Sequence, residues 1–255
     1  MTRFFVIALM ALFPLTFAQA QDAEKAPEAA PAADIDHSPF HTLLKANVKG
    51  SKVNYDGFAK SAEFKAYVAL LGKTDPASLP SRNARLAFWI NAYNALTINA
   101  VLAHYPKIQS VLKVTPDFFK SKTRSAGGKT LALNDIENRI IRPKFKDPRI
   151  HAALNCASVS CPPLANFAFT AKGLNGQLKK VFTAFVNDTT RNQIDAGAGT
   201  VKLSKIFEWY GVDFKKAGGP AKYMAGFMAD EAKKKLLSET ASVQFLPYDW
   251  NLNKL

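Results

Sequence analysis

The chain has 255 residues, of which 48% are hydrophobic, and a formal net charge of +14. This length fits one large domain better than two small ones and is enough to bury a full core. Beyond the N-terminus, no stretch is apolar for the about 20 residues that a membrane-spanning helix needs, so we expect no transmembrane span in the mature chain.

The first twenty residues are typical of a secretory signal peptide. Residues 1–20 contain an early Arg3, an apolar run at 4–17 and a small-x-small AQA cleavage sequence. Residues 21–36 are rich in Ala, Pro and acid, and this composition predicts a disordered tether. Residues 37–255 are then the folded domain of an exported protein, located in the periplasm if the source is a Gram-negative bacterium.

Charge is uneven along the chain. Residues 1–37 carry two basic and five acidic residues, a net charge of −3, so the remainder carries +17. A field this positive favours an anionic polymer or lipid surface of the cell envelope as partner. The basic residues are spread singly or in short groups, not along one stripe rich in arginine and aromatic residues, and no nucleic acid is expected.

The first half of the domain predicts helices. Residues 37–48 and 61–73 have amphipathic patterns, and a turn punctuated by Gly lies between them at 49–58. A long hydrophobic segment follows from Arg85 to its stop at Pro106. It is apolar on nearly all sides, so we expect a buried central helix.

Asn91 and Asn94 lie three residues apart and share a face of that helix. A buried amide without partners costs about 1–3 kcal/mol, so each must hydrogen-bond to something. Two roles are open: the amides fix a neighbouring loop or strand, or they line a site and orient a catalytic group.

The second half of the domain predicts hairpins and shorter helices. The predicted elements are a Gly-Gly hairpin at 123–133, a helix at 134–141 with Asn134 as N-cap and Glu137 completing a capping box, a hairpin at 191–204, a helix capped by Ser204, a helix at 220–237 with Pro220 in its first turn, and a strand at 241–250. The fold class is therefore α+β, a helix-rich single domain whose buried central helix packs on a small, mainly antiparallel sheet.

The segment RIHAALNCASVSCPPL, residues 149–164, contains both cysteines of the chain. If residues 149–156 form a strand, alternation places His151 and Asn155 on one face and Cys156 on the other. A direct pair of His151 and Cys156 then requires a bulge or an earlier strand end.

Three states of Cys156 are open. At the end of a strand it is a candidate reactive thiol, with the Ser158 and Ser160 hydroxyls around it. In an oxidising compartment it is a candidate for a disulfide with Cys161. It is also a candidate for an inert buried thiol.

Metal and cofactor signals are weak. His37 and His41 are four residues apart, but Pro39 lies between them and the Glu of a zincin helix is missing. The sequence contains no Gly-rich phosphate loop and no GxSxG motif. We therefore predict no metal site and no cofactor.

Four segments resemble one family. FWINAYNA, ALNCASVSCPPL, LSKIFEWYGVDF and YDWNLN occur in this order between about Phe40 and Asn253, as in the domain of unknown function 547 family. The resemblance implies that the function is not established. It also implies that certain residues belong to the family pattern: Asn91, Tyr93, Asn94, His151, Cys156, Trp209, Tyr210, Asp249 and Trp250. Plant relatives tend to have serine at the position of Cys161, which argues against a shared disulfide.

Two functions follow as hypotheses. The first, which we favour on sequence alone, is a binding or interaction module of the cell envelope with a basic surface. The second is a thiol-dependent hydrolase or transferase, or a redox protein. Its candidate catalytic residues are Cys156, His151 and Asn155, and its supporting residues are Asn91, Tyr93, Asn94 and Asp249.

Overall fold

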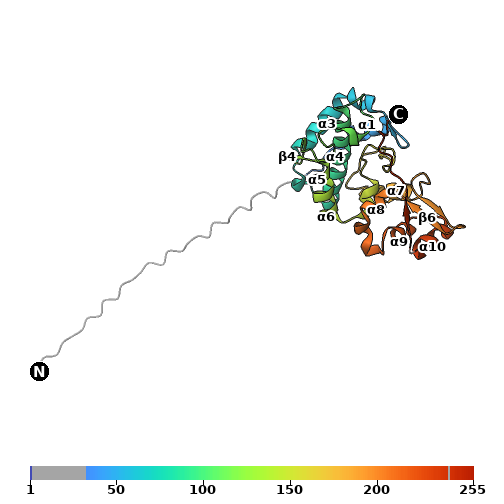
Figure 1. The fold of residues 1–255 in the computed structure, drawn as a ribbon. Coiled ribbons are helices and arrows are strands. Elements are labelled where there is room, and N and C mark those ends of the chain that lie inside the picture. Colours follow the sequence, from blue (N-terminus) through green and yellow to red (C-terminus); the bar gives the residue numbers. More distant parts are fainter. Residues whose placement is uncertain (2–32, 241) are drawn as a thin grey trace. The chain divides into compact units, whose positions relative to one another are not determined.

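The structure, a computed structural model, describes residue 1 and residues 33–240 and 242–255. The predicted signal peptide at 1–20 and most of the predicted tether at 21–36 lie outside the described residues. From residue 33 on, the described residues form one compact unit (Figure 1). None of the described helices combines the length and hydropathy of a membrane-spanning segment.

Helices make up most of the described fold. The α-helices are α1 (Ser38–Asn47), α2 (Tyr55–Ala59), α3 (Ala62–Lys73), α4 (Arg82–Leu102), α5 (Leu133–Asp135), α6 (Arg142–Phe145), α7 (Leu174–Val186), α8 (Lys205–Trp209), α9 (Pro220–Ala225) and α10 (Glu231–Glu239). Short 3-10 helices are η1 (Pro76–Ser78), η2 (Val111–Lys113), η4 (Pro148–Ala152) and η5 (Gly211–Ala217), and a π-helical turn is η3 (Ile136–Ile141).

The central helix α4 is buried on nearly all sides, as its sequence predicts. It begins three residues before Arg85, because the Ser81 hydroxyl accepts a hydrogen bond from Ala84 N at 3.0 Å and caps the helix. Its main neighbours are α2, α3, α5 and η3. Helices therefore cover α4, where the sequence predicted a sheet.

The strands of the described residues form three small sheets. They are β1 (Val48–Lys49) with β2 (Lys52–Val53), β3 (Arg124–Ala126) with β4 (Lys129–Leu131), and β5 (Gln193–Asp195) with β6 (Thr200–Leu203) and β7 (Gln244–Phe245). All pairs are antiparallel except β6 with β7. Both predicted hairpins and the α+β class are confirmed. Gly127 and Gly128 turn the β3–β4 hairpin with φ of +64° and +69°, which favours glycine.

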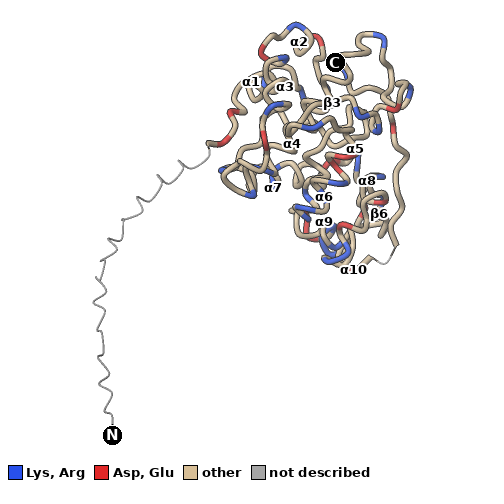
Figure 2. Tube along the Cα trace, turned by 90° about the vertical axis from the view of Figure 1, so that its left-hand side faces the viewer, with Lys and Arg blue, Asp and Glu red and all other residues tan. Residues whose placement is uncertain are grey.

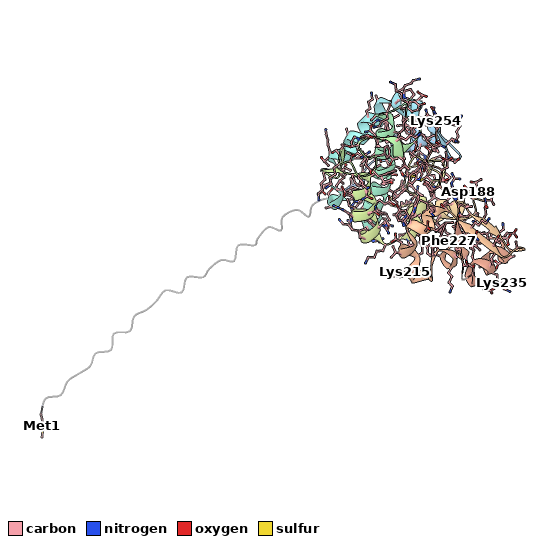
Figure 3. The ribbon with its side chains drawn as sticks, in the orientation of Figure 1. Met1, Asp188, Lys215, Phe227, Lys235 and Lys254 are labelled. Carbon is pink, nitrogen blue, oxygen red and sulfur yellow. The ribbon has the colours of Figure 1, made fainter. Side chains whose placement is uncertain are left out.

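Two apolar clusters form the core. The larger surrounds α4 and includes Phe40, Phe58 and Phe88. The smaller joins α7, α8, α9 and η5 around Phe182 and Phe207. Figure 3 shows Lys215, Phe227 and Lys235 among the C-terminal elements, whereas Lys254, near the end of the chain, lies beside the N-terminal elements.

The C-terminal segment crosses back to the N-terminal elements. Val53 N donates to Asn253 O at 2.9 Å, and Leu255 N donates to Val53 O at 3.0 Å. The Tyr55 hydroxyl donates to Asn253 Oδ1 at 2.6 Å. The segment that precedes Asn253 is thereby fixed against the body of the fold.

The predicted strand at 149–156 is wrong. Residues Pro148–Ala152 form the 3-10 helix η4, which begins where Asp147 Oδ1 accepts from Arg149 N at 3.0 Å. An Asp followed by Pro is a strong signal for a helix start, and it overrides the alternation of the following residues. His151 and Cys156 therefore do not lie on opposite faces of a strand.

Two other predicted helices differ in detail. The segment 220–237 is not one helix, because α9 ends at Ala225 and α10 begins after a new cap, Asp230, whose carboxylate accepts from Lys233 N at 3.1 Å. Asn134 is not an N-cap. Helix α5 starts one residue earlier, and Asp135 Oδ2 accepts from Ala132 N at 3.1 Å.

Candidate functional site

A cavity of about 260 Å³ lies where elements of both apolar clusters meet. Its aromatic lining is Tyr93, Phe119, Trp209, Tyr210, Tyr248 and Trp250. Its polar lining is Asn134, Glu137, His151, Cys156 and Cys161, and Leu154 and Ile206 complete it. The cavity is therefore lined by residues that are far apart in the sequence, from Tyr93 in the middle of α4 to Trp250 in the C-terminal segment.

Hydroxyl groups surround the half-buried Cys156 thiol. Sγ lies 3.0 Å from Ser158 Oγ and 3.2 Å from Tyr248 Oη. These two oxygens are themselves 3.0 Å apart. Cys156 N donates to Cys161 Sγ at 3.0 Å, and both cysteines are free thiols. The predicted disulfide alternative is therefore not the state that the structure holds.

This arrangement lowers the pKa of the Cys156 thiol to about 7. Burial raises the pKa, but hydrogen bonds from the Cys161 thiol, the Ser158 hydroxyl and amide, and the Tyr248 hydroxyl outweigh burial. Burial and the neighbouring Cys156 raise the pKa of Cys161 well above its usual value. Cys156 is thus the thiol that ionises near neutral pH, and a thiolate is the reactive form of cysteine.

Two buried amides hold the backbone that carries Cys156. Asn94 Nδ2 donates to Ala153 O at 2.8 Å, and Asn94 Oδ1 accepts from Asn155 N at 2.9 Å. Asn155 Nδ2 donates to Pro162 O at 2.9 Å, and its Oδ1 accepts from Ala157 N at 3.0 Å. Ala157 has φ of +64°, a left-handed conformation that a non-glycine residue adopts only when neighbours hold it.

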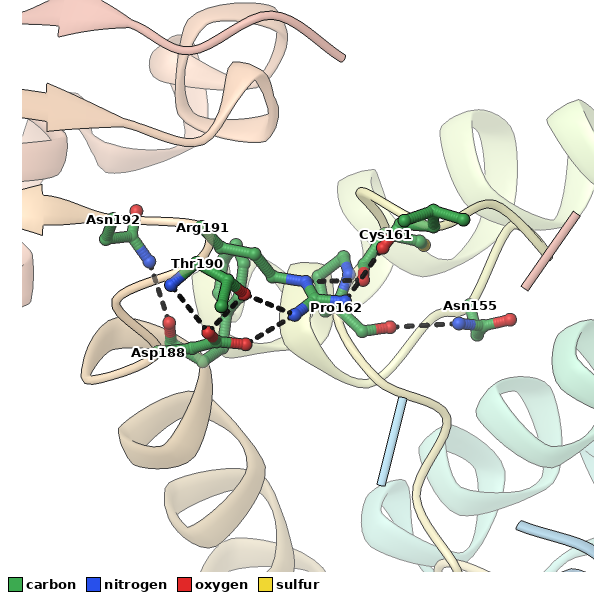
Figure 4. Close-up of polar contacts among 9 residues, drawn as sticks. Asn155, Cys161, Pro162, Asp188, Thr190, Arg191 and Asn192 are labelled. Carbon is green, nitrogen blue, oxygen red and sulfur yellow. Dashed lines mark hydrogen bonds and ion pairs between the residues drawn. The ribbon is translucent and has the colours of Figure 1, made fainter. Parts of the chain in front are cut away.

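Arg191 holds the same segment from the side of the β5–β6 sheet (Figure 4). Nε donates to Cys161 O at 2.9 Å, and Nη2 donates to Val159 O at 2.8 Å. Asp188 Oδ2 pairs with Nη1 at 2.5 Å and offsets the guanidinium charge. Arg191 is therefore a positioning residue for the loop between the two cysteines.

His151 belongs to a charged group on another part of the cavity wall. Its Nε2 lies 2.8 Å from Asp213 Oδ2, and Arg142 Nε and Nη2 bind the same carboxylate at 2.7 and 3.0 Å. The imidazole stacks on Tyr210, with ring centroids 4.1 Å apart. Asp213 is the acceptor, so the tautomer with the proton on Nε2 is assigned, and Nδ1 has no hydrogen-bond partner among the described residues.

The charges around Asp213 change its titration. Partial burial raises the pKa of the carboxyl group, but the hydrogen bonds from His151 and Arg142 and the charge of the Arg142 guanidinium lower it far below its usual range. Asp213 therefore stays ionised throughout the neutral range and fixes the orientation of His151.

Three of the aromatic residues form a stacked group on the cavity wall. Trp209 and Trp250 stack with centroids 5.7 Å apart, and Tyr248 lies within 4.8 Å of Trp209 and 4.6 Å of Trp250. Trp209 remains 42% exposed, so this part of the cavity wall is open to solvent. Glu137, which also lines the cavity, is only 8% exposed, and burial together with the facing Glu137 carboxyl group raises the pKa of the Tyr210 hydroxyl.

The matched family segment contains the centre of this site. Residues 76–186 match the family model described as "Protein of unknown function, DUF547". Residues 76–186 belong to the DUF547 family. No curated protein matches the chain, and no solved structure matches it. The DUF547 segment supplies Tyr93, Glu137, His151 and Cys156, whereas Asp213 and Tyr248 come from outside it.

The structure divides the predicted site residues into those that line the cavity and those that do not. His151, Cys156, Cys161 and Tyr93 line the cavity. Asn91, Asn94 and Asn155 instead hold backbone. Asn91 bonds both Phe169 O at 2.8 Å and Phe169 N at 2.9 Å.

Asp249 is exposed and lies outside the cavity lining. Its Oδ1 accepts from Asn251 N at 2.8 Å and caps a local turn. The Ser160 hydroxyl, predicted to surround the thiol, instead accepts from Asp249 N at 2.8 Å. Ser158 takes the predicted position beside Sγ.

Sequence reasoning missed Glu137, Tyr248 and Asp213 as site residues. Tyr248 directly precedes Asp249 in the family segment YDWNLN, and Asp213 lies in the family segment LSKIFEWYGVDF. For Tyr248 and Asp213, membership of these family segments was the sequence signal that could have identified them as site residues.

No group of three metal-binding side chains lies among the residues that the structure describes. His37 is buried, with Nδ1 2.7 Å from the Tyr67 hydroxyl, whereas His41 is exposed. The two histidines that the spacing singled out therefore have separate surroundings.

Proposed function

We propose that the DUF547 chain is a thiol-dependent enzyme that transfers or hydrolyses an acyl group, with Cys156 as nucleophile. The observation that carries the proposal is the Cys156 sulfur at the wall of an aromatic cavity, within 3.2 Å of two hydroxyl groups. Hydrogen bonds from neutral donors stabilise a thiolate without a paired cation. The same cavity is lined by His151 and Glu137, which supply groups for proton transfer.

The proposed reaction has two steps. The Cys156 thiolate attacks the acyl carbon, a C–S bond forms, and the bond to the leaving alcohol, thiol or amine breaks as that group takes up a proton from solvent. Water or an acceptor amine then attacks the thioester, the C–S bond breaks, and the thiolate returns. His151 Nδ1 accepts the proton of the attacking group, because Nε2 is committed to Asp213.

Acylation by p-nitrophenyl acetate tests the proposal. We expect one p-nitrophenolate per chain in a fast burst and an acetyl adduct on the peptide that contains Cys156. The burst rate should rise with pH to half its maximum near pH 7, because the thiol ionises there. Peptide mapping separates Cys156 from the buried Cys161, whose thiol should remain unmodified.

Two controls complete this test. Cys156→Ser should remove the burst, whereas Cys161→Ala should keep it, with the half-maximum moved to higher pH because one donor to Sγ is lost. A Cys156 that reacts no faster than free cysteine at pH 7 would falsify the proposal, and so would an adduct on Cys161 alone.

We propose, second, that the protein is exported and binds an envelope component, as its composition indicates. The support is the N-terminal pattern of residues 1–20 and the net charge of +17 over residues 38–255. This role needs no reactive thiol. In cells, Cys156→Ser would leave envelope association unchanged, and removal of residues 1–20 would abolish export.

A further inference from the structure

We propose that a hollow beside the start of α4 binds a small ligand that carries two or more phosphate groups. The hollow has a volume of about 680 Å³ and draws its lining from η1, α4, the β3–β4 hairpin, η3 and α6. Six basic side chains line it: Arg82, Arg85, Lys122, Lys129, Arg139 and Lys144. We call this set the basic hollow.

The two acidic side chains of the basic hollow already have hydrogen-bond or ion-pair partners within the protein. Asp75 Oδ1 accepts from Ala77 N at 2.9 Å. Asp135 accepts from Ala132 N at 3.1 Å and pairs with Arg139 at 3.3 Å. Six basic residues against these two acids leave the lining with a net charge of +4, which favours a ligand with several negative charges.

The basic groups keep donors free for such a ligand. Lys122, Lys129 and Lys144 have no ion pair in the described part of the chain. Arg82 donates one N–H to Phe145 O, and Arg85 donates one to Leu79 O. A guanidinium has five N–H donors in a planar fork, so each arginine retains most of them for phosphate oxygens.

Helix α4 adds to this field. It has 21 residues, begins at Arg82 and has no acidic residue in its first turn, so the positive end of its dipole is not offset there. Arg82, Arg85 and Trp89 follow at helical spacing and line the same hollow. A volume of this size suits a small molecule, and its concave form brings charges from separate elements around one ligand, which a flat lipid surface would not engage.

The basic hollow is separate from the Cys156 cavity. The two share no lining residue, although α4 and η3 contribute to both. Other basic residues are distributed over many elements, α6 and α9 among them (Figure 2). The basic hollow is therefore one concave set of charges, and ligand binding there does not require the thiol chemistry proposed above.

Titration calorimetry of the full chain with inorganic tripolyphosphate tests the inference. We compare the wild type with a triple variant, Lys122→Gln, Lys129→Gln and Lys144→Gln. A matched control is Lys172→Gln, Lys179→Gln and Lys202→Gln, three exposed lysines outside the hollow. We expect the affinity to fall by about tenfold or more in the first variant and by less than about twofold in the control.

Other results would overturn the inference. An equal loss in both triple variants would mean that diffuse charge attracts the anion. Binding to phosphatidylglycerol vesicles without binding to tripolyphosphate would identify a membrane surface instead. Cys156→Ser should bind tripolyphosphate as the wild type does, so a loss there would contradict the separation of the two sites.

Discussion

Two parts of the cavity wall are held by different forces. The part that carries Cys156 is held by side-chain donors on backbone carbonyls: Asn94 on Ala153, Asn155 on Pro162, and Arg191 on Val159 and Cys161. The part that carries His151 is held by one carboxylate, Asp213, which binds His151 and Arg142.

Because of this difference, the interactions that hold the two parts of the wall should respond differently to pH. The Asn94 and Asn155 amides of the Cys156 wall do not titrate, so their hold on the loop is the same at neutral and acidic pH. The His151 wall depends on a carboxylate charge and loses its hold when Asp213 is protonated. The loop thus presents the thiol, and the ion cluster fixes the orientation of the imidazole.

The largest effect is expected from Asn94→Ala. This change leaves Ala153 O and Asn155 N buried without partners, and the free energy of unfolding should fall by about 2–4 kcal/mol. The loss, measured by urea unfolding, should be equal at pH 7 and pH 5, because no titrating group is removed.

The matched control for Asn94 is Asn99→Ala on the same helix. Asn99 is exposed, so its replacement should change the free energy of unfolding by less than about 0.5 kcal/mol. Equal losses in the two variants would show that Asn94 acts through helix propensity and not through the loop.

A smaller effect is expected from Asp213→Asn. The variant removes the charge that binds His151 and Arg142, and the free energy of unfolding at pH 7 should fall by about 1–2 kcal/mol. The folded-state pKa of Asp213 is lowered, so its stabilisation is complete above the unfolded pKa of about 4 and is lost as pH falls below it.

Urea unfolding at pH 7, 5 and 3 measures this dependence. The difference between wild type and Asp213→Asn should be similar at pH 7 and 5 and smaller at pH 3. A difference in the free energy of unfolding that is the same at all three pH values would show that the His151 wall does not depend on the charge of Asp213. Asp249→Asn, an exposed control, should show less than about 0.5 kcal/mol at each pH.

The smallest effect on stability is expected from Tyr248→Phe. Loss of the hydroxyl removes its hydrogen bonds with Sγ at 3.2 Å and with Ser158 Oγ at 3.0 Å, together worth about 1 kcal/mol, and raises the Cys156 pKa above its present value of about 7. The pH at half-maximal alkylation rate should rise by less than about one unit.

The control for Tyr248 is Tyr223→Phe. Tyr223 lies in α9 and does not line the Cys156 cavity, so its replacement should leave the alkylation profile unchanged. A lower Cys156 pKa in Tyr248→Phe would mean that the hydroxyl accepts from the thiol instead of donating to it.

Local patterns in the sequence predicted the elements whose causes are local. The pair Gly127 and Gly128 predicted the β3–β4 hairpin, Ser204 predicted the start of α8, and all-round hydrophobicity predicted the burial of α4. The Ser158 hydroxyl was expected near the thiol because it is only two residues away.

Contacts between distant segments were not predictable in this way. Tyr248 is 92 residues from Cys156, and Asp213 is 62 residues from His151. No periodicity or spacing reports on such pairs, because they arise only when the two apolar clusters pack together. The strand predicted at 149–156 was wrong for a local reason. The alternation of apolar and polar residues there favoured a strand, but Asp147 and Pro148 start a 3-10 helix.

The π-helical turn η3, between α5 and α6, determines the directions in which the side chains at its two ends point. Arg142 N donates to Glu137 O, five residues earlier, in place of the four-residue spacing of an α-helix. In an α-helix, residues five apart point about 140° away from each other. The wider turn lets Glu137 face the Tyr210 hydroxyl while Arg142 lies 4.8 Å from the Tyr210 ring. A single-residue deletion in η3 would preserve a helix but rotate one of these two side chains away from Tyr210.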